Sequence, residues 1–248
     1  MYDYGYSSGL DYGSQLGYYM SNGLYGFSTV LVIIMFFAAL YASYHVKSVY
    51  RKYDKVQNKR GITAEQAVAA VLRYYNVQGV TIQHISGNLT DNFNPSTGVI
   101  SLSDSVYGKS SIAAIGVACH EAGHAAQHAE GYKPIQLRNM IVPLCNIGSN
   151  LGIPIALVGF FLGLDQLVLF GLLLYSLIAI FQFVTLPVEF NASKRALKVI
   201  KETGLLEGGE EKGAYKVLRA AAMTYVVALA TTLANLLRYV AIFTRRRD

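Results

Sequence analysis

The chain contains four long apolar stretches separated by polar sequence. Each holds about 20 residues or more, the length that an α-helix needs to cross the hydrocarbon core of a bilayer. The stretches are residues 24–46, 141–164, 166–186 and 220–243. They predict four transmembrane helices, the second and third forming a hairpin that turns at Asp165. The fourth could instead be a re-entrant or interfacial helix, because several polar residues interrupt it.

The sequence between the first two apolar stretches, residues 47–140, has the mixed pattern of a small soluble segment. Thr63 and Gln66 form a capping-box pattern that predicts the start of a helix. Residues 80–85 and 99–103 have the β-branched or alternating pattern of two strands. An edge strand in this segment could pair with an extended peptide, because its outer backbone groups are free.

Composition indicates a membrane protein rather than a soluble domain. Of the 248 residues, 53% are hydrophobic and only 15% are charged, which is unusually apolar for a soluble chain. The net charge of +6 could suggest nucleic acid, but the basic residues lie beside apolar stretches, where they indicate topology. We therefore expect a lipid bilayer as partner and no nucleic acid. Cys119 and Cys145 form no C-x-x-C pair, and Cys119 is expected to serve packing.

The distribution of charge predicts how the chain is oriented. Lys and Arg are concentrated in residues 47–140 and 187–219 and are absent from residues 1–23 and from the turn at Asp165. Cytoplasmic segments are enriched in Lys and Arg, so the first two segments are expected to face the cytoplasm. Residues 1–23, rich in Tyr, Gly and Ser, are predicted to be a disordered tail on the outer side.

The chemistry of the chain centres on a helix predicted over residues 110–131, with serines at its start and Gly131 at its end as capping signals. This helix contains His120, Glu121 and His124 in the spacing H-E-x-x-H. Residues four apart lie on one helix face, so the two histidines could bind one zinc ion and leave a position open for water. Glu121 would then be placed as the general acid/base of a hydrolysis reaction. We expect one zinc ion per chain.

A third zinc ligand is expected from the segment that follows the third apolar stretch. Glu189 lies there, on the same predicted membrane side as the two histidines, and a carboxylate is a common partner of two imidazoles on zinc. Alternatively, Glu189 merely caps a helix that follows Pro187. Ser193 falls one turn later on the same face, where its hydroxyl could hydrogen-bond to a ligand. Asn191 is a further candidate for that supporting role.

Three other residues are weighed for roles at the site. His128 lies two helical turns beyond His120, about 12 Å along the helix, whereas a zinc–nitrogen bond is only about 2.0–2.1 Å long. We therefore expect His128 to be a polar helix position or a hydrogen-bonding partner of a ligand. Arg195 and Tyr225 are expected near the site in membrane depth. Either could stabilise the oxyanion that forms during peptide hydrolysis.

The motifs resemble those of a known family, the bacterial neutral zinc metallopeptidases of the YugP-like type. The resemblance runs from about residue 24 to residue 238. It rests on Asn92-Phe-Asn-Pro, Val99-Ile-Ser-Leu-Ser, Val106-Tyr, the stretch from Ser110 to His128, and Leu186-Pro-Val-Glu-Phe-Asn-Ala-Ser-Lys-Arg-Ala. It implies a membrane-embedded zinc protease in which His120, His124 and Glu189 bind the metal and Glu121 is the catalytic acid/base.

The expected fold class is accordingly a mainly α membrane protein with about four transmembrane helices and a small α+β domain. The resemblance implies that this domain is zincin-like, of the gluzincin type. The layout also resembles the HtpX-type membrane proteases, in which a transmembrane hairpin separates H-E-x-x-H from the glutamate ligand. Those proteins usually carry Asp four residues after that glutamate. Ser193 occupies the position here, so the hydrogen bonding around the ligands is expected to differ.

The leading hypothesis is a zinc-dependent endopeptidase in a bacterial plasma membrane, with its active site facing the cytoplasm. Its partner would be a protein or peptide substrate, cleaved within or close to the membrane. The alternative from another class is a membrane scaffold that binds zinc without catalysis. Glu121 favours the enzyme, because a purely structural metal site does not need that carboxylate. A transporter or channel would need more ionisable residues inside the apolar stretches.

Overall fold

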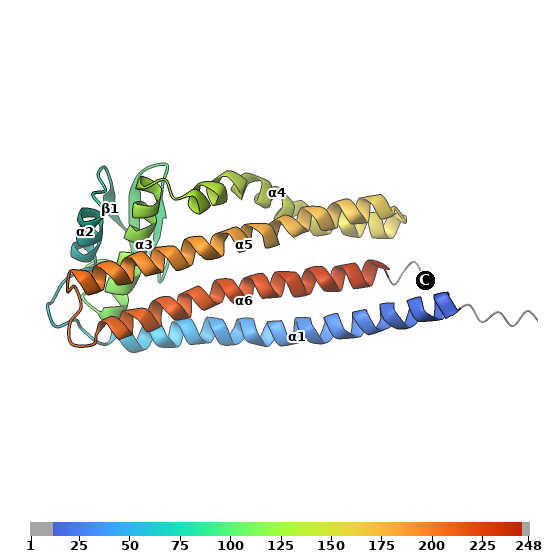
Figure 1. The fold of residues 1–248 in the computed structure, drawn as a ribbon, viewed down its shortest axis with the longest axis horizontal. Coiled ribbons are helices and arrows are strands. Elements are labelled where there is room, and N and C mark those ends of the chain that lie inside the picture. The colour runs from blue at the N-terminus through green and yellow to red at the C-terminus, as the bar shows by residue number, and fades with distance from the viewer. Residues whose placement is uncertain (1–11, 245–248) are drawn as a thin grey trace, which may run out of the picture.

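A computed structural model describes the backbone of residues 12–244 and the side chains of residues 22–244 (Figure 1). The molecule is elongated, with long helices along its length and a small domain at one end (Figure 1). The long helices are α1 (Tyr12–Asp54), α4 (Lys133–Leu162), α5 (Asp165–Glu202) and α6 (Glu211–Thr244). The small domain contains α2 (Ala64–Tyr74), α3 (Ile112–Ala129), β1 (Thr81–Ile85), β2 (Asn92–Asn94) and β3 (Val99–Ser103).

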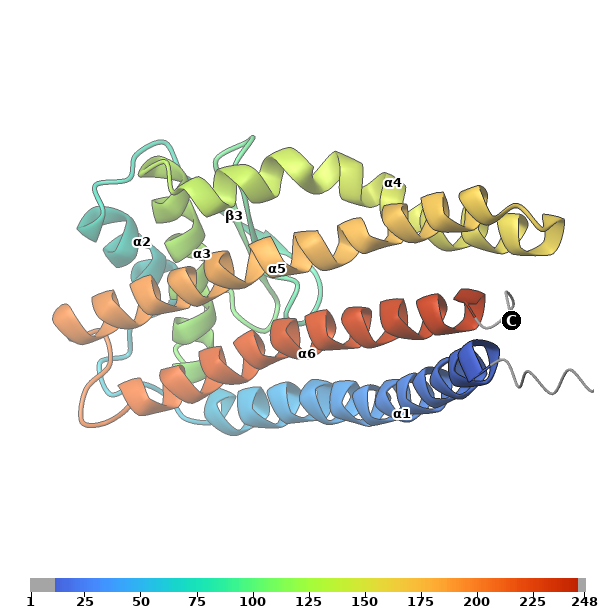
Figure 2. The same ribbon diagram turned by 45° about the vertical axis from the view of Figure 1, so that its right-hand side comes forward.

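Within the described residues, the four long helices are each long and apolar enough to cross a membrane, by length and composition. They form two pairs, α4 with α5 and α1 with α6, and contacts between α5 and α6 join the pairs (Figures 1 and 2). Large apolar side chains point outward from them: Phe37 is 62% exposed and Phe161 is 79% exposed. An apolar outer surface of this kind suits contact with lipid. The predicted mainly α membrane fold with a small α+β part is confirmed.

All four long helices extend beyond the apolar stretches that predicted them. Because α1 already begins at Tyr12, the prediction of a disordered tail is wrong for residues 12–23; residues 1–11 lie outside the described residues. The helix α4 starts at Lys133 and α6 starts at Glu211, both within polar sequence. Hydropathy marks only the part of a helix that suits lipid. At the domain end, packing against the small domain keeps the polar ends of α5 and α6 helical.

The helix α5 runs without interruption through Pro187, where a new helix was expected to begin. A proline removes one backbone hydrogen bond and can bend a helix without ending it. Nearby, the hydroxyl of Thr185 donates to the carbonyl of Phe181 at 2.8 Å, a bond from side chain to backbone that accompanies the proline. Glu189 therefore belongs to the same helix as the third apolar stretch, and no flexible joint separates the site from the membrane-spanning part.

The small domain is built around a three-stranded sheet with the order β1-β3-β2. The central strand β3 pairs in parallel with β1 and antiparallel with β2. The strand β2 was not expected, because residues 92–94 lie in a sequence rich in turn-forming residues. The predicted capping box is confirmed: Thr63 accepts from the backbone of Gln66, whose side chain accepts from the backbone of Thr63.

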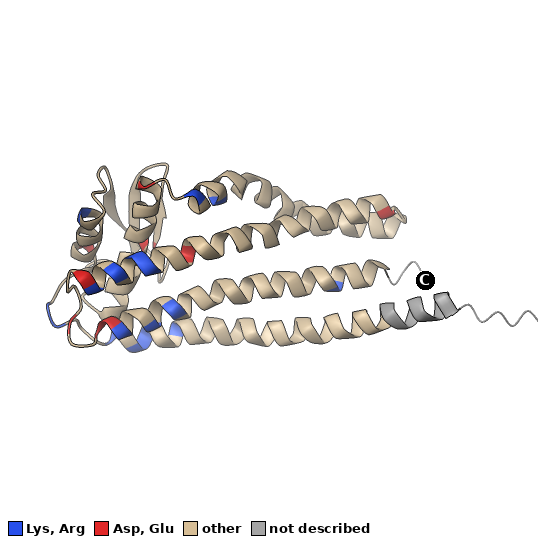
Figure 3. Ribbon diagram, in the orientation of Figure 1, with Lys and Arg blue, Asp and Glu red and all other residues tan. Residues whose placement is uncertain are grey.

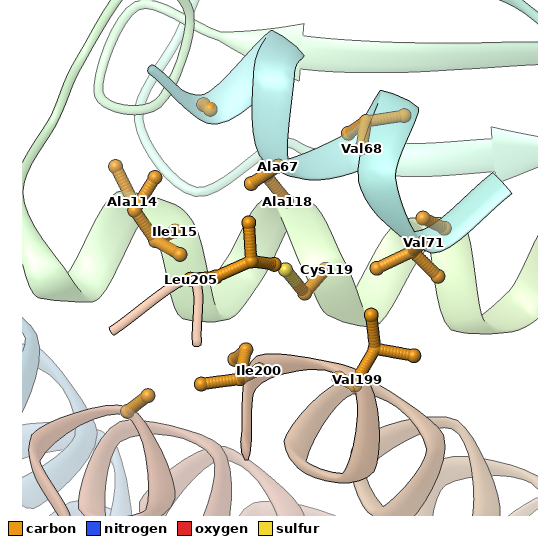
Figure 4. Packing of buried hydrophobic residues seen from close by; sticks show 14 of the residues in the cluster. Ala67, Val68, Val71, Ala114, Ile115, Ala118, Cys119, Val199, Ile200 and Leu205 are labelled. Carbon is orange, nitrogen blue, oxygen red and sulfur yellow. The ribbon is translucent and has the colours of Figure 1, made fainter. Parts of the chain in front are cut away.

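One hydrophobic core joins the small domain to the domain end of α5 (Figure 4). Cys119 of α3 lies fully buried in it, between Val71 of α2 and Val199 and Ile200 of α5 (Figure 4). Burial raises the pKa of the Cys119 thiol to about 12, so the sulfur stays protonated and is a poor metal ligand. This agrees with the packing role expected for Cys119. The shared core fixes the position of α3 relative to α5, and these two helices carry the residues of the site.

Candidate metal centre

The helix α3, at the domain end of the molecule, carries the H-E-x-x-H residues (Figure 1). Its N-terminus is capped by Ser111, whose hydroxyl accepts from the backbone amide of Ala114 at 3.2 Å. The same hydroxyl donates to Asp54 at the end of α1, at 2.9 Å. Most residues of α3 are buried, because α2, α5 and α6 pack around it. The two histidines are therefore presented by a rigid element rather than by a loop.

His120, His124 and Glu189 come together in space although 65 residues separate the last two in the sequence. Their ligand atoms all lie within 4.8 Å of one another. Glu189 Oε2 lies 3.2 Å from His120 Nε2 and 3.6 Å from His124 Nε2. Tetrahedral zinc with bonds of about 2.0–2.1 Å would separate its ligand atoms by about 3.4 Å. The spacing of this His–His–Glu trio therefore fits a zinc ion.

The approach of α5 to α3 depends on Gly123, inside the H-E-x-x-H segment. A Cβ atom at Gly123 would lie 2.7 Å from the carbonyl oxygen of Ala192, which is too close for any non-bonded contact. Glycine at this position lets the two backbones touch, three residues beyond Glu189 on α5. The absence of one side chain thus brings the carboxylate within reach of the histidines.

Hydrogen bonds on the far side of each imidazole orient the rings. His120 Nδ1 lies 3.1 Å from the Ser193 hydroxyl, and His124 Nδ1 lies 3.0 Å from Gln127 Oε1. The amide nitrogen of Gln127 donates to the carbonyl of Val188 at 2.8 Å, so its oxygen is the atom that faces His124. His124 must then donate through Nδ1, which leaves the Nε2 lone pair for a metal. The expected supporting role of Ser193 agrees with this geometry.

Gln127 is a functional candidate that the sequence reasoning missed. It is fully buried near the C-terminal end of α3, and it hydrogen-bonds to His124, Val188 and Asn191. A buried amide needs partners on both its oxygen and its nitrogen. Its position three residues after His124, on the same face of the helix, is the signal that could have revealed it.

Two side chains from other helices contact Glu189. Arg138 of α4 lies 3.4 Å from Glu189 Oε1, the oxygen that does not face the histidines. Tyr225 of α6 lies close to Glu189, and the two residues line the same pocket. Arg138 was not foreseen, because nothing in its local sequence distinguishes it from the other basic residues of the segment. Four helices, α3 to α6, thus meet at this carboxylate.

Glu121 lies beside the trio without belonging to it. Its side chain is only 8% exposed and lines a pocket of about 280 Å³ together with His120, Glu189 and Tyr225. Burial raises the pKa of Glu121, and the neighbouring His120 and His124 oppose that rise. A metal cation in the trio would oppose this rise in pKa and favour the ionised carboxylate. The carboxylate can therefore exchange a proton with a molecule held in the pocket.

The pocket walls come from several parts of the chain. Val46 and Tyr50 of α1 and Val217 and Ala221 of α6 supply apolar surface. Asp91 lines the pocket as well, and both of its oxygens accept hydrogen bonds from Ser103, at 2.7 and 3.0 Å. The sequence reasoning missed Asp91, which directly precedes the Asn-Phe-Asn-Pro segment. The mixture of apolar walls and a few polar groups is typical of a binding site.

The structure does not bring every predicted residue into the pocket. His128 is exposed on α3, with its ring 6.1 Å from that of Phe93, and it does not belong to the trio of possible metal ligands. Arg195 pairs with Glu130 at 2.7 Å and lies outside the described lining of the pocket. The guanidinium therefore does not occupy the oxyanion-stabilising position suggested for it. Asn191 is linked to the site through Gln127, whose amide nitrogen donates a hydrogen bond to Asn191 Oδ1 at 3.0 Å.

The fold and the site together define a helical membrane protein with a candidate zinc centre of two histidines and one glutamate. The chain belongs to the family described as "Putative neutral zinc metallopeptidase", which matches residues 28–244. It is similar to the "Putative membrane protease YugP" of Bacillus subtilis (strain 168). The two are 42% identical over 223 residues, which cover 88% of this chain and 99% of that protein. No solved structure matches the chain.

Proposed function

We propose that the protein is a membrane-embedded zinc endopeptidase that cleaves membrane or membrane-proximal proteins. The observation that carries the proposal is the location of Glu121, a proton-exchanging carboxylate beside the His–His–Glu trio and inside a pocket. A site that only stored or structurally used zinc would gain nothing from this carboxylate. The family membership and the name of the Bacillus relative support the same class of activity.

His120, His124 and Glu189 would hold the zinc ion, one per chain. A zinc ion bound there would acidify water and polarise the scissile carbonyl. Glu121 accepts a proton from the attacking water and delivers it to the amine that leaves. Tyr225 lines the pocket and is the better placed of the two proposed oxyanion-stabilising residues, because its hydroxyl lies next to Glu189.

The small sheet offers a place for the substrate backbone. The strand β2 is at the edge of the sheet, and it packs against α3, the helix that carries the two histidines. An extended peptide could add to the free edge of β2 and thereby cross the pocket. Such binding recognises the backbone rather than particular side chains, which suits a protease with unstructured or locally unfolded substrates.

The charge distribution supports a site on the cytoplasmic side. Among the residues that the structure describes, Lys and Arg gather at the end of the helices that carries the small domain, whereas the far end carries Asp165 and a single Arg of α6 (Figure 3). Arg245, Arg246 and Arg247, which follow α6 in the sequence, lie outside the described residues. In bacterial membrane proteins this pattern places the basic end in the cytoplasm. Substrates would then be cytoplasmic segments of membrane proteins or proteins bound to the inner surface.

The proposal is tested by replacing Glu121 with Gln and measuring zinc content and peptide hydrolysis of the purified protein together. Zinc should remain bound while hydrolysis falls by about a hundredfold or more, because general acid–base catalysis contributes about 10²–10⁴. Glu202→Gln, an equal change on the exposed end of α5, should leave both unchanged. A wild-type protein that binds zinc but cleaves neither an unstructured peptide library nor a single-span membrane protein would favour the scaffold.

A further inference from the structure

A second pocket lies between α1 and α6, on the side of this helix pair away from the metal centre. It has a volume of about 460 Å³ and shares no lining residue with the pocket that contains Glu121. On α6, Lys216, Arg219 and Ala220 line the second pocket, whereas Val217 and Ala221 line the first. The two pockets therefore lie on opposite faces of the same helix, and nothing in the proposed chemistry uses the second one.

One end of this second pocket is basic. Lys52 of α1 and Lys216 and Arg219 of α6 line it, and all three are exposed. None of the three forms an ion pair with another side chain in the described part of the protein. No acidic residue lines the pocket. Three cations thus line one cavity that has no acidic residue in its lining.

The other end of the pocket is apolar. Ala38 and Ala42 of α1 and Met223 and Val227 of α6 line it. From Ala38 to Lys52, α1 advances 14 residues, about 21 Å at 1.5 Å per residue. The helix α6 runs in the opposite direction beside it, so its basic and apolar residues fall at matching levels (Figures 1 and 2). The pocket is therefore an elongated groove that changes from basic to apolar along the membrane-spanning direction.

We propose that this basic pocket, lined by Lys52, Lys216 and Arg219 above an apolar floor, binds the headgroup of an anionic phospholipid. The phosphate would lie among the three cations, and an acyl chain would run along the groove toward Ala38 and Val227. A small soluble anion would use only the basic end. A lipid would use the whole groove, because its charged headgroup would lie at the basic end and its acyl chain would lie along the apolar end.

The position of the groove gives the lipid a structural consequence. Tyr50 and Val46 on α1 and Val217 on α6 form part of the wall of the catalytic pocket, directly behind the lipid groove. A lipid that bridges cations of both helices would hold α1 against α6 by neutralising charges that otherwise repel each other. The proposal requires neither zinc nor proteolysis, so it stands or fails separately from the proposed function.

The experiment uses the whole protein in nanodiscs that contain equal amounts of phosphatidylglycerol and phosphatidylcholine. Native mass spectrometry then counts the lipids that stay bound after the disc is removed. The wild type should retain phosphatidylglycerol in preference to phosphatidylcholine. The triple variant Lys52→Gln, Lys216→Gln, Arg219→Gln should retain about tenfold less, since cations near a membrane surface contribute cooperatively to anionic lipid binding.

The matched control removes the same charge elsewhere: Lys55→Gln, Lys194→Gln and Lys201→Gln, all exposed and none lining the pocket. This variant should retain phosphatidylglycerol as the wild type does. Equal retention by all three proteins, or equal retention of the two lipids, would overturn the proposal. Displacement of the lipid by millimolar inorganic phosphate would indicate a simple anion site instead. If the triple variant does not fold, the three single variants should each reduce retention by about twofold or more.

Discussion

Each histidine of the trio uses its two ring nitrogens for different purposes. The Nε2 atoms face Glu189, and the Nδ1 atoms face Ser193 and Gln127. A ring nitrogen held by an oxygen acceptor fixes both the tautomer and the ring plane, which prepares the other nitrogen for a metal. Glu189 is also held in place by side chains outside the trio, since Arg138 of α4 and Tyr225 of α6 approach it.

Glu189 is predicted to be the third zinc ligand. Glu189→Ala should lower zinc affinity at least tenfold and abolish hydrolysis, because two imidazoles alone leave the ion held by α3 only. Zinc affinity is measured by competition with a chromophoric chelator. Glu207→Ala, at an exposed position outside the site, should change neither quantity. Full zinc affinity in the Glu189 variant would contradict the assignment of the site.

Gln127 is predicted to support the metal through His124. Gln127→Ala would leave His124 Nδ1 without its acceptor and the carbonyl of Val188 without its donor. Loss of such a partner typically reduces metal affinity by about 10–100-fold. The neighbouring His128→Ala, an exposed change outside the trio, serves as control and should have little effect. Equal zinc affinities in the two variants would show that Gln127 only fills space.

At the scale of the elements, the site depends on how closely α3 and α5 cross. The helix α5 contributes Glu189 and Ser193 one turn apart, and it continues without a break into the membrane-spanning part. The shared core between α3, α5 and α2 fixes the crossing, and Gly123 sets its distance. A displacement of α5 by a few tenths of an ångström would move the carboxylate away from both histidines together.

Two glycines of α3 allow this dependence to be tested. Gly123→Ala places a methyl group 2.7 Å from the Ala192 carbonyl, so the helices must separate. We expect a loss of about 1–3 kcal/mol of stability, together with weaker zinc binding. Gly116→Ala places its methyl group 3.5 Å from Ala214, an ordinary contact, and should stabilise the helix by about 0.5–1 kcal/mol. Chemical denaturation followed by circular dichroism compares them; similar effects would refute the crossing argument.

At the scale of the whole molecule, charge and hydropathy divide the protein along its length. The small domain, the trio and most Lys and Arg residues lie toward one end, and the turn between α4 and α5 lies at the other (Figures 1 and 3). This arrangement places the candidate catalytic site near the boundary between the apolar helices and the polar domain. Membrane-proximal chains could reach it from the side of the small domain.

The predicted orientation is tested by cysteine labelling in intact cells with a reagent that does not cross membranes. Lys133→Cys and Lys198→Cys, at the domain end, should react only after the membrane is opened. Gln166→Cys, at the exposed start of α5, should react from outside and is the positive control. The native Cys119 and Cys145 are buried and should add little background. Labelling of the domain-end cysteines in intact cells would reverse the proposed orientation.

The sequence by itself determined the features that depend on neighbouring residues. The four apolar stretches follow from length and hydropathy, and the pairing of His120 with His124 follows from the period of a helix. The capping box at Thr63 depends on residues three apart. Glu189 could also be proposed, because its place after an apolar stretch and before a basic segment indicates a membrane side.

Only the tertiary structure decided how distant segments meet. The contact between Gly123 and Ala192, and the hydrogen bonds from Gln127 and Arg138, join helices that are far apart in the chain. Arg195 illustrates the limit, since its expected membrane depth suggested a place at the site, whereas its side chain pairs with Glu130. A pattern along one helix fixes which residues share a face. Which face meets which neighbour, and at what distance, depends on the packing of the whole core.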